Sequence, residues 1–210
     1  MTDPATWLIA GPKRAEWTVA LAHGAGAPMD SPFMNIVADG LAAAGLRVVR
    51  FEFPYMARRR AEGKRGSPDA PMVLHRAWRE VIAASAPAER LVVGGKSMGG
   101  RIASEVAAEA PQSVAGIACL GYPFHPPGRP ERTRTAHLAD LAVPMLVVQG
   151  ERDSFGTPDD VAGYALSPSV RFVWLPDGDH SFKPRKRSGH TEDDNIRRAI
   201  AAVVNFVGGL

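Results

Sequence analysis

One stretch of the chain decides the fold: Leu91-Val92-Val93-Gly94-Gly95-Lys96-Ser97-Met98-Gly99. An apolar, strand-like run leads into a G-x-S-x-G pattern over residues 95–99, and a helix-like segment over residues 101–110 follows it. Glycines at this spacing let the chain turn sharply from strand to helix, because larger side chains would collide with neighbouring backbone. The stretch therefore predicts a nucleophile elbow that leaves the Ser97 hydroxyl free at a helix N-terminus.

A serine hydroxyl needs a base to accept its proton and a third group to orient that base. Asp153 follows the strand-like run at residues 144–149, and His180 follows the run at residues 170–175. We therefore expect Ser97, Asp153 and His180 to form a catalytic triad. Asp177 and Asp179 are the alternatives for the acid, but they lie so close in sequence to His180 that reaching its Nδ1 while Nε2 faces the serine is awkward.

A glycine-rich turn near the N-terminus adds a further element of an acyl-transfer site. The apolar run at residues 19–22 leads into His23-Gly24-Ala25-Gly26-Ala27-Pro28. Acyl transfer builds negative charge on a carbonyl oxygen, and two preorganised backbone N–H groups stabilise that charge. We assign this oxyanion hole to the N–H groups of Ala25 and Met98, and we expect His23 to hold the loop.

The whole chain has the length and the pattern of one α/β domain over residues 1–210. Strand-like runs occur at residues 19–22, 47–53, 90–94, 114–120, 144–149 and 170–175. Amphipathic segments alternate with them at residues 36–44, 73–86, 101–110, 159–165 and 194–207. This alternation predicts a mostly parallel central sheet with helices on both faces, and residues 7–10 are expected to add an antiparallel edge strand.

Several classes of protein and of site are disfavoured by the sequence. No apolar run approaches about 18 residues and the N-terminus lacks a signal-like segment, so we expect a cytoplasmic protein without a membrane span. The lone Cys119 lies in an apolar run and is expected to be buried. No residues have metal-ligand spacing, and a dinucleotide-binding loop would need glycine at Met29, so neither a metal nor a cofactor is expected.

The net charge of +3 comes with three basic clusters, namely Arg58-Arg59-Arg60, Lys64-Arg65 and Lys183 to Arg187. None has the interleaved aromatic residues of a nucleic-acid surface, so we expect solvated loops and no nucleic-acid partner. A positive field that attracts an anionic substrate is the alternative.

Two charged residues, Lys96 and Glu52, lie at the ends of strands that should otherwise be buried. We expect them to pair with each other or with Arg101, with Arg50 in the same network, because an unpaired buried charge is costly.

Longer strings of sequence resemble a known family. They are His23-Gly24-Ala25-Gly26-Ala27-Pro28, Arg50-Phe51-Glu52-Phe53-Pro54-Tyr55-Met56, Gly95-Lys96-Ser97-Met98-Gly99, Gly121-Tyr122-Pro123-Phe124 and Gly150-Glu151-Arg152-Asp153. From about residue 20 onward the chain resembles the α/β-hydrolase superfamily, in particular small bacterial hydrolases akin to dienelactone hydrolases. It is similar above all to the branch that contains the hydrolase-like subunit of a histone acetyltransferase complex and testis-expressed hydrolase-like proteins.

The resemblance implies an α/β-hydrolase fold with Ser97, Asp153 and His180 as its triad. Dienelactone hydrolases proper use a cysteine where this chain has Ser97, so lactone hydrolysis does not carry over. The proline-rich interval at residues 122–141 is too short for a lid domain, which predicts an open site for short acyl groups. Four apolar side chains are expected to line the acyl pocket, namely Tyr55, Met56, Tyr122 and Phe124.

These observations together predict a serine hydrolase. We expect it to cleave a carboxylic ester or thioester of a small acyl substrate through an acyl-enzyme, without cofactor or metal. The alternative is a binding or regulatory module that keeps the hydrolase fold with weak catalysis, and a nucleic-acid-binding protein comes third.

Overall fold

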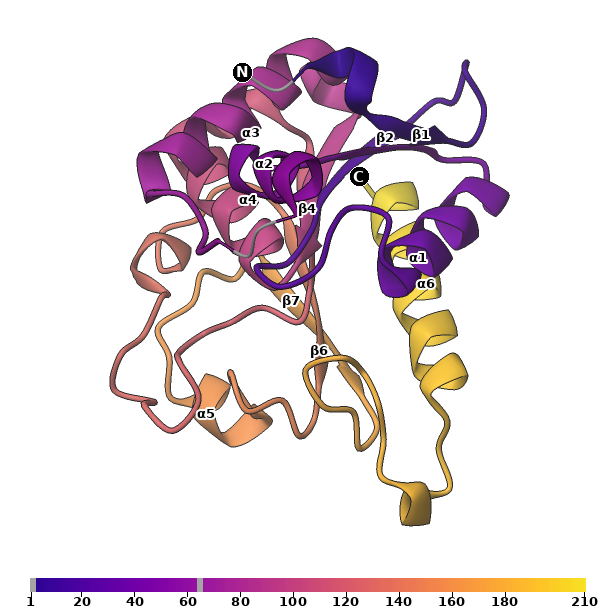
Figure 1. The fold of residues 1–210 in the computed structure, drawn as a ribbon. Coiled ribbons are helices and arrows are strands. Elements are labelled where there is room, and N and C mark those ends of the chain that lie inside the picture. The colour runs from indigo at the N-terminus through magenta and orange to yellow at the C-terminus, as the bar shows by residue number, and fades with distance from the viewer. Residues whose placement is uncertain (1–2, 64–65) are drawn as a thin grey trace.

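The computed structural model describes residues 3–63 and 66–210 and shows a seven-stranded sheet between two layers of helices (Figure 1). The strands are β1 (Leu8–Ala10), β2 (Thr18–Ala22), β3 (Arg47–Phe51), β4 (Leu91–Lys96), β5 (Gly116–Leu120), β6 (Met145–Gly150) and β7 (Val170–Leu175). Their spatial order is β1-β3-β2-β4-β5-β6-β7, and all neighbours are parallel except β1 and β3. The predicted single-domain α/β fold with a mostly parallel sheet is confirmed, and so is its antiparallel edge strand.

Helices cover both faces of the sheet, as predicted. They are α1 (Pro32–Ala43), α2 (Pro54–Glu62), α3 (Pro71–Ser85), α4 (Met98–Glu109), α5 (Pro158–Ala162) and α6 (Glu192–Gly208). Buried side chains of α1 and α6 form one apolar cluster with the sheet, while those of α2 to α5 belong to the cluster on the other face. The yellow α6 and the purple α1 lie side by side in Figure 1. No helix in the described part of the chain combines the length and the apolarity that crossing a membrane requires.

One helix was missed by the sequence analysis. The strand predicted over residues 47–53 ends at Phe51, because Phe53 is the N-cap of α2 and Pro54 occupies its first turn. Proline suits this position, since its fixed φ matches the helix and its missing N–H is not needed there. The basic residues Arg58 to Arg60 therefore lie on a helix and not in the loop that was expected, and Lys64 and Arg65 fall outside the described residues.

The fully described segment between β5 and β6 contains only the 3-10 turn Ala136–Leu138. This confirms the prediction that the fold has no lid domain. Because parallel strands end at the same edge of a sheet, the loops after β2, β4, β6 and β7 meet there. Those four loops carry all the residues predicted for catalysis.

Candidate active site

Ser97 lies on a strained turn between β4 and α4. Its φ of 52° is in a region that non-glycine residues rarely adopt, and its N–H donates to the Leu120 carbonyl oxygen at 3.1 Å. The turn packs tightly against β2, since a Cβ on Gly99 would lie 2.5 Å from the Ala22 carbonyl oxygen. Gly95 meets the same oxygen and has a φ of +143°. The glycines of the motif are therefore required by close backbone approach and by strained conformation.

The structure brings Ser97, His180 and Asp153 together in one chain of hydrogen bonds. His180 Nε2 is 2.9 Å from Ser97 Oγ, and His180 Nδ1 is 2.7 Å from Asp153 Oδ2. With Nδ1 donating to the carboxylate, Nε2 is left to accept the serine proton. This is the arrangement that general-base activation of a hydroxyl requires.

Asp153 is fully buried and has two further hydrogen-bond donors. Phe155 N–H donates to Oδ1 at 2.9 Å, and Gln149 Nε2 donates to Oδ2 at 2.9 Å. Gln149 was not singled out in the sequence, although a polar residue at the end of the apolar strand β6 was the available signal. Its side-chain oxygen also accepts from the Tyr122 N–H, so it ties the acid-bearing loop to the end of β5.

The two alternative acids take other partners. Asp177 forms ion pairs with Arg185 and Arg152, and the Arg185 guanidinium lowers the pKa of Asp177 to about 2. Asp179 Oδ1 accepts the N–H groups of Ser181 and Lys183 and so closes the turn that holds His180. The geometry therefore favours Asp153 as the partner of His180.

The glycine-rich loop after β2 faces Ser97. Neither the Ala25 N–H nor the Met98 N–H has a hydrogen-bond partner among the described residues, and Ala25 lines the cavity beside Ser97. Tyr55 braces the loop by donating its hydroxyl to the Ala25 carbonyl oxygen at 3.0 Å. Buried His23 accepts the Phe53 N–H at Nε2 and contacts the Gly24 carbonyl oxygen through Nδ1, and burial lowers its pKa, so it holds the loop as a neutral side chain.

A cavity of about 570 Å³ opens next to Ser97. It lies between the loop after β2, the start of α1 and the loops that carry Asp153 and His180. Its walls are mainly apolar and include the rings of Phe33 from α1 and Phe155. The Phe155 ring lies 4.3 Å from the His180 ring, so it shields one face of the imidazole. Lys96 and Glu192 are the charged residues that line it.

The four side chains expected to form the acyl pocket lie elsewhere. They are all at most 3% exposed and none lines the cavity, namely Tyr55, Met56, Tyr122 and Phe124. All four belong to the apolar cluster on the α3 and α4 face of the sheet, whereas the cavity opens toward α1. The start of α1 and Phe155, which do line it, were not identified in the sequence, because only the packing of helix and loops sets which side of Ser97 is open.

The expected charge network is also wrong. Glu52 pairs with Arg60 at 2.7 Å, and Arg101 pairs with Glu105. Lys96 pairs with neither, and instead its Nζ donates to the main-chain oxygen of His180 at 2.5 Å.

Arg50 and Cys119 do not line the cavity beside Ser97. Arg50 donates to the Met29 carbonyl oxygen at 3.1 Å. Cys119 is buried as expected, and burial raises its thiol pKa beyond the usual range. Within the described ranges, no cluster of His, Cys, Asp or Glu is arranged to bind a metal ion.

Solved structures with the same fold include several hydrolases. A putative hydrolase of the alpha/beta superfamily from Xanthomonas campestris pv. campestris is 23% identical, with a TM-score of 0.64 over 92% of this chain and 99% of that one. An alpha-beta serine hydrolase homologue from Coxiella burnetii is 22% identical (TM-score 0.67, 95% and 89% coverage). Dienelactone hydrolase from Anabaena variabilis is 21% identical (TM-score 0.67, 100% and 94% coverage).

A family model described as an alpha/beta hydrolase domain matches residues 15–208, which is nearly the whole chain. The match includes the strained serine turn, the loop after β2 and both loops that carry Asp153 and His180. The chain therefore belongs to the α/β-hydrolase family.

Proposed function

We propose that this protein is a serine hydrolase that cleaves a carboxylic ester or thioester of a small substrate through an acyl-enzyme. The observation that carries the proposal is the unbroken hydrogen-bond chain from Ser97 Oγ through His180 to the buried Asp153 carboxylate. It lies at the edge of an apolar cavity that is open to solvent. Family membership agrees with hydrolysis as the type of reaction.

In the first half of the reaction, His180 Nε2 accepts the proton of Ser97 as Oγ attacks the substrate carbonyl carbon. The carbonyl oxygen becomes an oxyanion, which the N–H groups of Ala25 and Met98 stabilise. The Met98 N–H belongs to the first turn of α4, where backbone donors lack partners within the helix. His180 then gives its proton to the departing alkoxide or thiolate, and the acyl group stays on Ser97.

In the second half, His180 takes a proton from water, and the resulting nucleophile attacks the acyl carbon. A second oxyanion forms at the same N–H groups. As it collapses, the bond to Ser97 Oγ breaks, His180 returns its proton to that oxygen, and the carboxylic acid is released. The Asp153 carboxylate stabilises the imidazolium that forms in both halves. Its two additional donors, Gln149 and Phe155, keep the carboxylate in place.

The first test is labelling of the purified protein with a fluorophosphonate, which reacts with activated serines. We expect one adduct, located on Ser97 by mass spectrometry. Ser97→Ala removes the nucleophile and His180→Ala removes the base, so both variants are expected to show no adduct. Ser181→Ala is the matched control, because Ser181 lines the same cavity without a hydrogen bond from its hydroxyl to His180.

An adduct on Ser97 that depends on His180 would make a series of short p-nitrophenyl esters and thioesters the next measurement. A folded protein that gives no adduct would refute the proposed chemistry. The binding or regulatory module expected as the alternative would then be the better description.

A further inference from the structure

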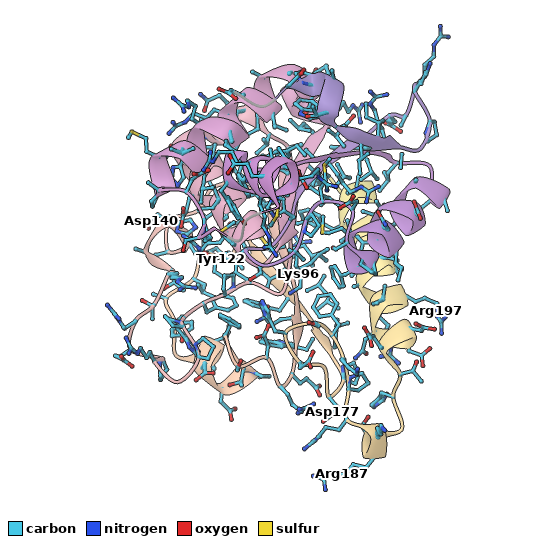
Figure 2. The ribbon with its side chains drawn as sticks, in the orientation of Figure 1. Lys96, Tyr122, Asp140, Asp177, Arg187 and Arg197 are labelled. Atoms are coloured by element: carbon cyan, nitrogen blue, oxygen red, sulfur yellow. The ribbon has the colours of Figure 1, made fainter. Side chains whose placement is uncertain are left out.

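One charged side chain in the site has no role in the chemistry above. Lys96 directly precedes Ser97 and lies near the centre of the molecule in Figure 2. It forms no ion pair with a described carboxylate, and its Nζ donates to the main-chain oxygen of His180. The rings of Phe33 and Phe182 lie 5.7 and 5.6 Å from Nζ, within the range of cation–π contact.

We propose that Lys96 is a positioning residue, whose ammonium group holds the backbone of His180 so that the imidazole stays aligned with Ser97. The inference rests on the proposed function, because it concerns the geometry of the same serine and histidine. Within the described ranges, Lys96 forms no hydrogen bond with the Ser97 hydroxyl or with the imidazole nitrogens, so it acts through the backbone of His180.

The contacts form a closed ring between the nucleophile and the base. Ser97 is joined by a peptide bond to Lys96, Lys96 Nζ contacts the His180 oxygen, and His180 Nε2 returns to Ser97 Oγ at 2.9 Å. A ring of this kind fixes the separation of two groups that lie 83 residues apart in sequence. Within the described ranges, two hydrogen bonds join His180 to residues 95–99, one from Lys96 Nζ and one with Ser97 Oγ. If the lysine contact is removed, the bond with Ser97 Oγ is the one that remains.

The space around Nζ is shaped for this contact. A Cβ on Gly121 would lie 2.7 Å from Nζ and 3.2 Å from the His180 oxygen, so the glycine leaves room for the ammonium group. Phe182, two residues after His180, is fully buried with a φ of +70°, and its ring lies 5.6 Å from Nζ. Lys96 therefore contacts the turn that carries His180 through both the His180 backbone oxygen and the Phe182 ring.

Protonation of Lys96 controls the strength of the contact. Burial lowers the pKa of Lys96 to about 8, and the nearby Asp153 and Asp179 oppose that shift. In the described part of the chain, those two carboxylates and His180 face Lys96 from the packed loops, and Glu192 at the start of α6 lines the same cavity. Below pH 8 the hydrogen bond has a charged donor, and charged donors bind about twice as strongly as neutral ones. As the pH rises through 8, the contact is expected to weaken.

The test combines steady-state kinetics with NMR of the ligand-free protein. Lys96→Met removes the charge at similar length, and we expect kcat for p-nitrophenyl acetate to fall about 10- to 100-fold, with KM changed less than about threefold. The low-field NMR signal of the proton between His180 and Asp153 should broaden or shift. Lys183→Met, an exposed lysine in the same loop, removes an equal charge and is expected to change neither readout.

The wild-type protein provides a measurement that does not depend on the variant folding. Its kcat and its low-field signal should both change as the pH rises through about 8, whereas Lys96→Arg, which stays charged, should lose that transition. A wild-type kcat that is flat from pH 7 to 10, or a Lys96→Met protein with normal kcat and signal, would overturn the inference. A wild-type protein without esterase activity or labelling would instead refute the proposed function, and the NMR signal would still report on Lys96.

Discussion

Replacing Asp153 by asparagine tests the proposed site most sharply. The amide keeps the size of the carboxylate but removes the charge that faces His180 Nδ1 at 2.7 Å. It also presents an NH2 group in a place where Gln149 Nε2 already donates, so two donors meet in a fully buried position. With the Asn NH2 toward His180, the imidazole is forced into the tautomer whose Nε2 carries the proton, and it cannot accept from Ser97.

The expected loss follows from these distances. Two unit charges whose centres are about 4 Å apart interact by about 4 kcal/mol at an effective dielectric constant of about 20. That corresponds to about three powers of ten in rate, at about 1.4 kcal/mol for each. The unfavourable tautomer adds to it, so we expect kcat/KM to fall by about 10³- to 10⁴-fold.

The assay is the second-order rate of fluorophosphonate labelling, followed by turnover of a short ester if one is found. Asp177→Asn serves as the control, because Asp177 lies three residues before His180 and pairs with Arg185 rather than with the imidazole. It should lower the rate less than about threefold. A folded Asp153→Asn protein within tenfold of the wild-type rate, or an equal loss in Asp177→Asn, would refute the assignment of the acid.

Three further outcomes are expected. Gly99→Ala places a Cβ 2.5 Å from a β2 carbonyl oxygen, so thermal or urea unfolding should show a loss of about 3 kcal/mol, and an unchanged midpoint would contradict the steric argument. Tyr55→Phe removes the hydroxyl that donates to the Ala25 oxygen, and kcat should fall about 3- to 10-fold with little change in melting temperature. The Asp177 pKa is lowered from 3.8 to about 2 by Arg185, so their ion pair stabilises the folded state above pH 3.8 and this stabilisation is lost as the pH falls toward 2. Arg185→Gln should therefore lower the melting temperature at pH 7 more than at pH 2, and an equal decrease at both values would argue against the pair.

Much of the sheet was predictable, because its strands are short apolar runs between turn residues and their pattern is local. The six parallel strands were found to within two residues at every end, and β7 was found over its full range Val170–Leu175. The helix α2 was missed because its apolar face is short, with only Tyr55 and Met56 buried. A basic, proline-led segment of this kind has a weak helical pattern in sequence, and packing against the core stabilises it.

The sequence by itself determined the fold class and the three side chains that the structure places in one hydrogen-bond chain, Ser97, His180 and Asp153. Their positions after successive strands were enough, because parallel strands end at a common edge. The tertiary structure alone decided which side of Ser97 is open, where Lys96 finds its partner and which aromatic ring covers His180. Those outcomes depend on how α1 and the loops pack against one another across long separations in sequence, and no local pattern of residues encodes that packing.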